Sequence, residues 1–206
     1  MKVIKMTPSK HVPDRWYAEL ENGTTLRVNV ALIADYSLFT GRELTEEETE
    51  SLLAAAGKIN AKARALRILG SRQLSHQELY RRLVEKGETN ENAEEAVAWL
   101  ESIGAINDTE YATIIVRHYT AKGYGIGRVK NELYQRGIPR ELWDDAIADM
   151  PDSQEPLDRL VATKLKGRLP EMAEMKKVTD ALCRRGYTWE EIKSALRRYE
   201  QSLEEE

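Results

Sequence analysis

The side chains that could support acid–base, nucleophilic or metal chemistry are few and scattered along the 206 residues. His11, His76 and His118 have neither the short spacings of metal ligands nor a nearby pair of carboxylates. Cys183 precedes two arginines, a setting that favours a reactive thiolate, but it also follows an apolar helix position. We interpret it as a half-buried structural residue. We find no catalytic constellation and predict neither a metal site nor a cofactor.

A glycine-rich segment, residues 123–127 with the sequence Gly-Tyr-Gly-Ile-Gly, is similar in composition to loops that cradle phosphates. No strand-like run precedes it. Arg128 stands where the dinucleotide-binding fingerprint has its third glycine. We therefore interpret the segment as a flexible turn between two helices.

These residues lie within a pattern that occurs three times. Gly87, Gly137 and Gly186 are 50 and 49 residues apart, and apolar residues stand eight and four positions before each of them. Further apolar residues follow at six, ten and thirteen positions. Such spacings form one face of an α-helix, and a glycine after the last apolar position is typical of a helix end at positive φ. Each unit therefore predicts a helix, a glycine turn and a second helix, preceded by a further helix.

Cations off the apolar stripe of these units are the candidate binding residues, because we expect them to be solvated. They are Arg81, Arg82, Arg128, Lys130, Lys176, Lys177 and Arg184. A charged exposed face is often only a solvated surface. Its recurrence on equivalent helices nevertheless allows a continuous binding ridge.

A second set of cations, Lys86, Arg136 and Arg185, directly precedes the three glycines. A positive charge in the last turn of a helix interacts favourably with the helix dipole, by about 0.3–1 kcal/mol. We assign these residues a structural role.

Aromatic side chains could serve either as core residues or as platforms for nucleobases. Tyr111, Tyr119, Tyr124 and Tyr134 could stack on bases, although at helical spacing we interpret them as packing residues. Trp143 falls on an apolar position of the second unit, so we predict that it is buried.

The N-terminal residues differ from the repeats. Residues 16–20 and 24–30 alternate in polarity around Asn22-Gly23, which predicts a β-hairpin that packs on helices or pairs with residues 3–6. Two short helices should follow, one over 31–38 and one that begins after Thr45 and ends near Gly57. A separate helix should run from 58 to 69.

We therefore divide the chain into an N-terminal part and three three-helix repeats. The ranges are residues 1–57, 58–105, 106–152 and 153–206, the last with an acidic tail that we expect to be disordered.

Composition bounds the class of protein. A single cysteine excludes an internal disulfide and fits the cytoplasm, and no apolar run reaches the length of about 20 residues that spans a membrane. The net charge is −4, yet residues 61–199 carry a net +2 and residues 156–199 a net +5. Proteins that depend on non-specific DNA contacts are usually more basic. This mixed charge, with a locally basic segment, fits binding to a protein partner at least as well as binding to DNA.

Several segments together carry a family resemblance: residues 65–69, 75–79, 83–87, 106–112, 125–129 and 132–138. The most specific combination is Asn-Asp-x-x-Tyr-Ala from Asn107 with Glu-Leu-x-x-Arg-Gly-Ile from Glu132. Over residues 60–199 the chain resembles the RecX family, bacterial modulators of the RecA recombinase.

The resemblance implies a mainly α-helical crescent of three tandem three-helix repeats, preceded by the N-terminal hairpin and helices. It also implies a cytoplasmic regulator in DNA repair, the SOS response and homologous recombination. Such a regulator binds the RecA filament and the DNA within it, with weak direct DNA binding, and limits filament extension, ATPase and recombinase activity. We expect a monomer that does not bind membranes. The family has no tight binding motif, so the seven candidate cations rest on exposure and charge alone.

Two other classes stay open. A helix-turn-helix regulator also uses short paired helices, and it would bind DNA tightly and salt-dependently without any protein partner. An enzyme or metal protein is the third class, and the missing ligand clusters argue against it.

Overall fold

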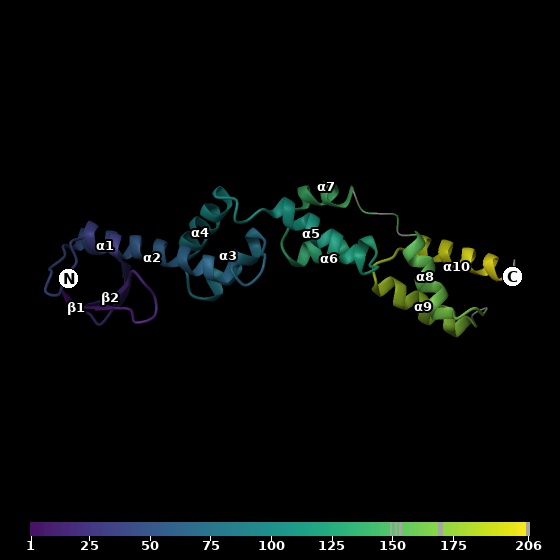
Figure 1. Ribbon diagram of the computed structural model, residues 1–206, viewed down its shortest axis with the longest axis horizontal. Coiled ribbons are helices and arrows are strands. Elements are labelled where there is room, and N and C mark those ends of the chain that lie inside the picture. The colour runs from purple at the N-terminus through teal and green to yellow at the C-terminus, as the bar shows by residue number, and fades with distance from the viewer. Residues whose placement is uncertain (149, 151, 153, 169–170, 205–206) are drawn as a thin grey trace. The chain divides into compact units, whose positions relative to one another are not determined.

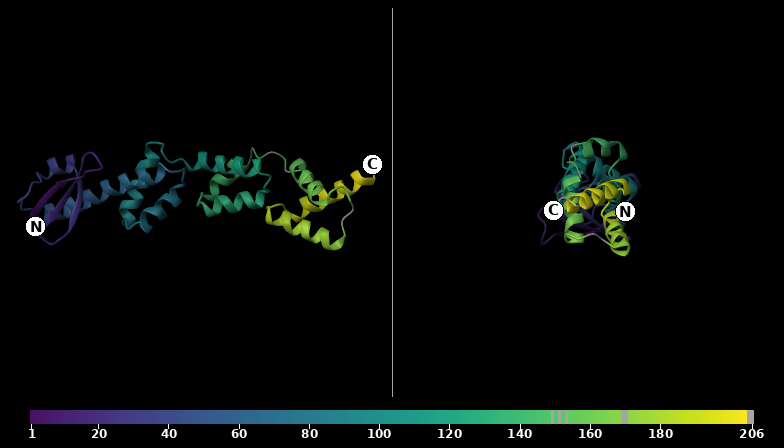
Figure 2. Two further views of the ribbon diagram at one scale, coloured as in Figure 1. Left: turned by 60° about the horizontal axis from the view of Figure 1, so that its bottom comes forward. Right: turned by 90° about the vertical axis from the view of Figure 1, so that its right-hand side faces the viewer.

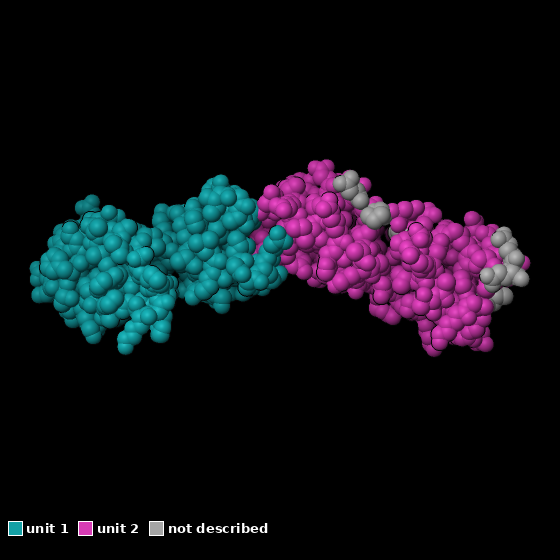
Figure 3. Space-filling view, viewed as in Figure 1, with its two compact units in different colours: residues 1–73, 79–106 teal, residues 74–78, 107–206 magenta. Residues whose placement is uncertain are grey.

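The computed structural model of the chain is mainly α-helical, with a small β-sheet at the N-terminus (Figure 1). It describes residues 1–148, 150, 152, 154–168 and 171–204. These residues form two compact units (Figure 3). Unit 1 comprises residues 1–73 and 79–106, and unit 2 comprises residues 74–78 and 107–206.

The sheet of unit 1 has three antiparallel strands in the order β1 (Val3–Pro8), β2 (Arg15–Leu20) and β3 (Thr25–Asn29). Gly23 has a φ of +83° in the turn between β2 and β3. Both the hairpin and its pairing with the first strand are therefore confirmed.

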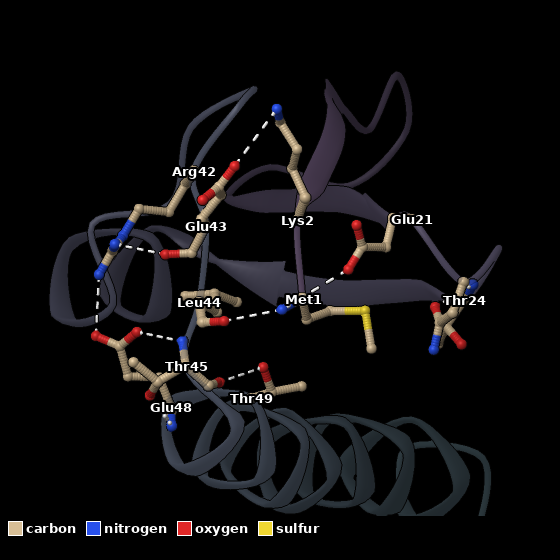
Figure 4. Close-up of polar contacts among 11 residues, drawn as sticks. Met1, Lys2, Glu21, Thr24, Arg42, Glu43, Leu44, Thr45, Glu48 and Thr49 are labelled. Carbon is tan, nitrogen blue, oxygen red and sulfur yellow. Dashed lines mark hydrogen bonds and ion pairs between the residues drawn. The ribbon is translucent and has the colours of Figure 1, made fainter.

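Two helices follow, α1 (Val30–Asp35) and α2 (Glu46–Leu69). The predicted cap of α2 is present, because Thr45 accepts a hydrogen bond from the Glu48 amide (3.1 Å) and the Glu48 carboxylate accepts one from Thr45 (2.9 Å). Glu48 also pairs with Arg42 at 2.9 Å (Figure 4). The start of α2 is thereby tied to the loop before it.

The prediction that a helix ends near Gly57 is wrong, because α2 continues through it to Leu69. Gly57 faces Asn92 of α4 (Asn90–Ser102), and a Cβ atom on Gly57 would lie 2.7 Å from the Asn92 Nδ2. The glycine thus permits two helices to approach closely and does not end one. The boundary between residues 57 and 58 falls inside this helix.

The remaining helices follow the predicted repeats. They are α3 (His76–Glu85), α5 (Asp108–Ala121), α6 (Ile126–Gln135), α7 (Trp143–Ala148, after a 3-10 turn at Arg140–Leu142), α8 (Gln154–Leu165), α9 (Met172–Arg184) and α10 (Trp189–Glu204). The middle helices α3, α6 and α9 end directly before the residue pairs that contain Gly87, Gly137 and Gly186. These glycines have φ values of +88°, +68° and +91°, as predicted.

Each glycine turn closes with the same hydrogen bonds. The residue after the glycine donates to the carbonyl five positions earlier, a pairing typical of glycine-terminated helices. The pairs are Glu88 with Leu83 (3.1 Å), Ile138 with Leu133 (3.0 Å) and Tyr187 with Leu182 (3.2 Å). The acceptor leucines are buried, so the apolar stripe and the turn position each other.

Two expectations about side chains and the tail need correction. Trp143 is half-buried against the apolar core of α5, α6 and α7 rather than fully buried, and its indole N–H donates to the Ile138 carbonyl (3.0 Å). The acidic tail is helical as far as Glu204, and Leu203 packs against the apolar core of α8, α9 and α10 (the third core). Residues 205 and 206 lie outside the described residues.

Candidate functional site

The seven candidate cations all lie on the middle helices. Arg81 and Arg82 are on α3, Arg128 and Lys130 on α6, and Lys176, Lys177 and Arg184 on α9. Five of them are exposed as expected, but Arg82 and Arg128 are half-buried. Whether these cations bind a partner stays a prediction.

Arg128 has a structural partner inside unit 2. Its guanidinium lies 2.6 Å from the Glu132 carboxylate, whose side chain is only 7% exposed. It also lies 6.0 Å from the ring centroids of Tyr119 and Tyr124. Arg128 therefore neutralises a buried carboxylate, so the expectation that it is freely solvated is wrong.

Arg136 belongs to the same cluster. It donates a hydrogen bond of 2.6 Å to the Tyr111 hydroxyl, and its Nε lies 3.8 Å from Glu132. Burial lowers the pKa of Arg136, but interactions with Tyr111 and Tyr119 outweigh this effect and raise the pKa above its ordinary value. Arg136 is a permanently charged structural residue, in line with the role assigned from the sequence.

The carbonyl groups of the three cations that precede the glycines each accept a hydrogen bond from an earlier part of the chain. Lys86 accepts from Arg64 in unit 1, whereas Arg136 accepts from Ser75 and Arg185 from Gly125 in unit 2. Carbonyls at a helix end lack partners within the helix. The recurring hydrogen bond therefore satisfies an equivalent acceptor carbonyl in each of the three repeats, and the donor group differs from one repeat to the next.

Residues 123–127 make a contact with the end of α9 that we did not predict from the sequence. The Gly125 N–H donates to the Arg185 carbonyl (3.0 Å), and the Gly127 N–H donates to the Gly186 carbonyl (2.9 Å). A Cβ atom on Gly125 would lie 2.5 Å from the Gly186 oxygen. The segment forms the turn between α5 and α6, as predicted, but it is also a tight backbone-to-backbone joint between α6 and α9, which was not predicted and does not fit a flexible turn. The sequence signal that could have indicated this contact is the Gly-x-Gly pair Gly125 and Gly127 together with Gly186 at the end of a distant helix.

Side chains around this joint reinforce it. The Tyr187 hydroxyl donates to the Gly123 carbonyl (3.1 Å), and burial raises the pKa of Tyr187. The Arg185 guanidinium lies 5.3 Å from the ring centroid of Tyr124. Arg185 and Arg128 thus both contact Tyr124, so the second and third repeats share one cation–aromatic cluster.

The Asn107-Asp108 pair, one of the motifs that carry the resemblance, also has a physical role. Asn107 accepts a hydrogen bond from the Glu110 amide (3.1 Å) and caps α5. Asp108 accepts one from the His76 amide (3.0 Å) at the start of α3. Two consecutive side chains therefore cap two different helices.

The residues with possible catalytic chemistry do not converge. His11, His118 and Cys183 are exposed, and His76 is half-buried. Exposure of Cys183 contradicts the expectation of half-burial, because its helix position faces away from the third core. Within the described ranges, no group of three or more His, Cys, Asp and Glu side chains is arranged to hold a metal ion. In the same part of the chain, no helix is long and apolar enough to cross a membrane.

The tyrosines divide into two groups. Tyr111 is buried, and Tyr119 and Tyr124 are half-buried against arginines, which confirms packing for these three. Tyr134 is 66% exposed, so the packing interpretation is wrong for this residue. Its position three residues before Gly137 is off the apolar stripe, which could have identified it.

Two family models match the chain. The model described as RecX, first three-helix domain, matches residues 61–100, and that described as RecX, second three-helix domain, matches residues 107–147. Two solved structures share the fold. A crystal structure of regulatory protein RecX is 23% identical with a TM-score of 0.69, covering 94% of this chain and 98% of that one. A crystal structure of RecX from Lactobacillus salivarius is 21% identical with a TM-score of 0.63, covering 71% and 99%.

Relatives named Regulatory protein RecX are more similar in sequence. The protein from Cronobacter sakazakii is 32% identical over 152 residues, which cover 66% of this chain and 90% of that protein. The protein from Escherichia coli K12 is 33% identical over 148 residues, covering 66% and 89%. With both helical domains and nearly the whole length of these relatives matched, the chain belongs to the RecX family of regulatory proteins.

Proposed function

We propose that this protein binds the filament that RecA forms on DNA and limits filament extension, ATP hydrolysis and recombinase activity. The observation that carries the proposal is the set of exposed cations on the middle helices of unit 2. Lys130 lies on α6, and Lys176, Lys177 and Arg184 lie on α9. A nucleoprotein filament combines protein surface with DNA phosphates, so exposed cations on a helical scaffold suit it.

The charge of the surrounding residues supports a modest phosphate contribution. Residues 156–199 carry a net +5, and the buried Glu132 is neutralised by Arg128. The chain as a whole nevertheless carries −4. Phosphate contacts alone would therefore give weak direct DNA binding, and contacts with the recombinase would supply the rest of the affinity.

The proposal extends to how the protein works. It acts by binding rather than by catalysis, as a cytoplasmic monomer without metal or cofactor. It is organised as an N-terminal part, residues 1–57, and repeats at 58–105, 106–152 and 153–206, with α2 shared between the N-terminal part and the first repeat. The family membership supports the regulatory role.

One observation disfavours α6 as the recognition helix of a helix-turn-helix DNA reader. Such proteins contact base edges with residues at the N-terminal end of the recognition helix. The corresponding end of α6 is occupied, because Gly125 and Gly127 donate their amides to Arg185 and Gly186. The N-terminal end of α6 therefore cannot enter a major groove while this joint is intact.

Co-sedimentation with filaments of the cognate RecA on single-stranded DNA tests the proposal, with naked DNA as the control. We expect tighter binding to the filament than to bare DNA, and slower ATP hydrolysis and extension at saturating protein. The double variant Lys176→Glu/Lys177→Glu should weaken filament binding, whereas Lys164→Glu, at an exposed position of α8, should not. Equal affinity for naked DNA and for the RecA-coated filament would support a DNA-binding regulator instead.

A further inference from the structure

We infer that Tyr134 stacks on an unpaired nucleobase, and that the outward faces of α6 and α9 form a track for single-stranded nucleic acid. This inference rests on the proposed function and names the component of the filament that unit 2 contacts. The first observation is the exposure of the Tyr134 side chain, which does not pack into a core. The Tyr134 side chain is 66% exposed, whereas Tyr119 and Tyr124 of the same unit pack against Arg128.

The surroundings of Tyr134 on α6 are cationic or neutral. Lys130 lies one turn earlier on the same helix face, and both Lys130 and Asn131 are exposed. The one acidic residue of α6, Glu132, is buried and paired with Arg128 at 2.6 Å. An aromatic ring beside an ammonium group, without a competing carboxylate on the helix, matches a base and its phosphate.

Exposed cations also predominate on α9. Lys176, Lys177 and Arg184 are exposed there, against one exposed acid, Asp180. The two helices follow each other along unit 2 (Figure 2), because the hydrogen bonds from Gly125 and Gly127 join the start of α6 to the end of α9. In the inferred track, Tyr134 would hold one base, and the exposed cations of the two joined helices would contact phosphates of the same strand.

The chemistry favours a single strand over a duplex and over a protein surface. A ring can stack on a base only where the base is not already stacked in a duplex. Proteins that bind single strands without sequence preference combine an aromatic platform with a cationic path along the backbone. Tyr134 with the four exposed cations supplies both components, and their charge complements a polyanion.

Photo-crosslinking identifies the contact directly. Single-stranded DNA carrying 5-iodouracil, bound by RecA and then by this protein, should crosslink to Tyr134 upon irradiation, as located by peptide mass spectrometry. Tyr134→Phe should retain the crosslink, and Tyr134→Leu, which keeps apolar bulk without a π-face, should lose it. In fluorescence anisotropy with bare DNA at low salt, Tyr134→Leu should weaken binding on the order of tenfold.

The cations give an independent readout. Lys130→Gln should reduce the slope of log affinity against log salt by about 0.7 for a single strand, whereas Lys164→Gln on α8 should leave it unchanged. Circular dichroism should show all variants folded. Crosslinks to other residues only, or equal affinity of Tyr134→Leu and the wild type for bare DNA, would overturn the inference. If Tyr134→Leu loses filament binding without any DNA crosslink in the wild type, Tyr134 contacts the recombinase, and the inference fails while the proposed function stands.

Discussion

The amide of Gly125 donates a hydrogen bond of 3.0 Å to the carbonyl oxygen of Arg185, 60 residues further along the chain. This bond and the adjacent one from Gly127 to Gly186 join two middle helices through main-chain atoms alone. Any Cβ atom at Gly125 would collide with Gly186. The spacing of α6 and α9, and hence of their exposed cations, is therefore fixed by glycines.

Alanine substitutions separate two roles of glycine. Gly87→Ala should cost about 1 kcal/mol, because φ is +88° and no atom lies within 4 Å of the added Cβ. Gly186→Ala should cost several-fold more, because φ is +91° and the Cβ would lie 2.1 Å from the Arg128 amide nitrogen. Urea unfolding measures both, and equal losses would contradict a close joint at Gly186. Gly137→Val, at a φ of +68°, should cost about 1 kcal/mol or more.

Arg128 and Lys130 should respond differently to charge reversal. Arg128→Glu places a second carboxylate beside the buried Glu132 and should destabilise the fold by about 2 kcal/mol, a value discounted because the Arg128 side chain is 38% exposed. Lys130→Glu should leave thermal stability nearly unchanged. A stable Arg128→Glu variant would show that Glu132 does not need this partner.

Arg64 should contribute to stability in unit 1. Its guanidinium donates to the Lys86 carbonyl and lies 2.8 Å from the Glu88 carboxylate, whose side chain is 9% exposed. Arg64→Ala should therefore cost about 2 kcal/mol. Arg67→Ala, at an exposed position of the same helix, serves as the control and should be near neutral in denaturant unfolding.

Tyr187 predicts a pH dependence. Because burial raises its pKa in the folded state, the unfolded chain ionises first, and the stability that Tyr187 contributes is complete below pH 10.0. This contribution is lost as pH rises through the folded pKa. The difference in free energy of unfolding between the wild type and Tyr187→Phe, measured from pH 8 to 11, should shrink across this window. A constant difference would contradict the buried hydroxyl.

Trp143 tests packing against binding. Trp143→Ala should cost about 3 kcal/mol, near the lower end for a large aromatic residue because the ring is half-buried. Calorimetry measures this loss. Unchanged stability together with lost filament binding would instead make Trp143 part of the interface.

Local sequence signals predicted the helices and their ends well. Glycine after an apolar stripe identified three positive-φ turns, and Asn22-Gly23 identified the hairpin, because both depend on residues close in sequence. The prediction that a helix ends at Gly57 was wrong because the glycine is needed for close contact with Asn92, 35 residues away. The contact made by the glycine-rich segment was missed for the same reason, because its partner, the backbone at Gly186, is distant in the sequence.

The candidate site was predicted less completely. Exposure of Lys130, Lys176, Lys177 and Arg184 follows from helical periodicity alone. The burial of Arg128 does not, because it depends on Glu132 turning inward and on the two tyrosines that flank it. A helical pattern assigns a face to each residue, but it does not reveal which charges are already neutralised.

The acceptors at the three helix ends are main-chain carbonyls, and their donors are a guanidinium, a hydroxyl and an amide. Every residue type supplies such a carbonyl, so mutation of Lys86, Arg136 or Arg185 leaves the acceptor in place. Substitution at these positions therefore removes only what the side chain contributes, such as the contacts of Arg136 with Tyr111 and Glu132, and leaves the main-chain connection in place. New binding specificities can evolve on the outward helix faces, while the connections between helices are inherited through the backbone.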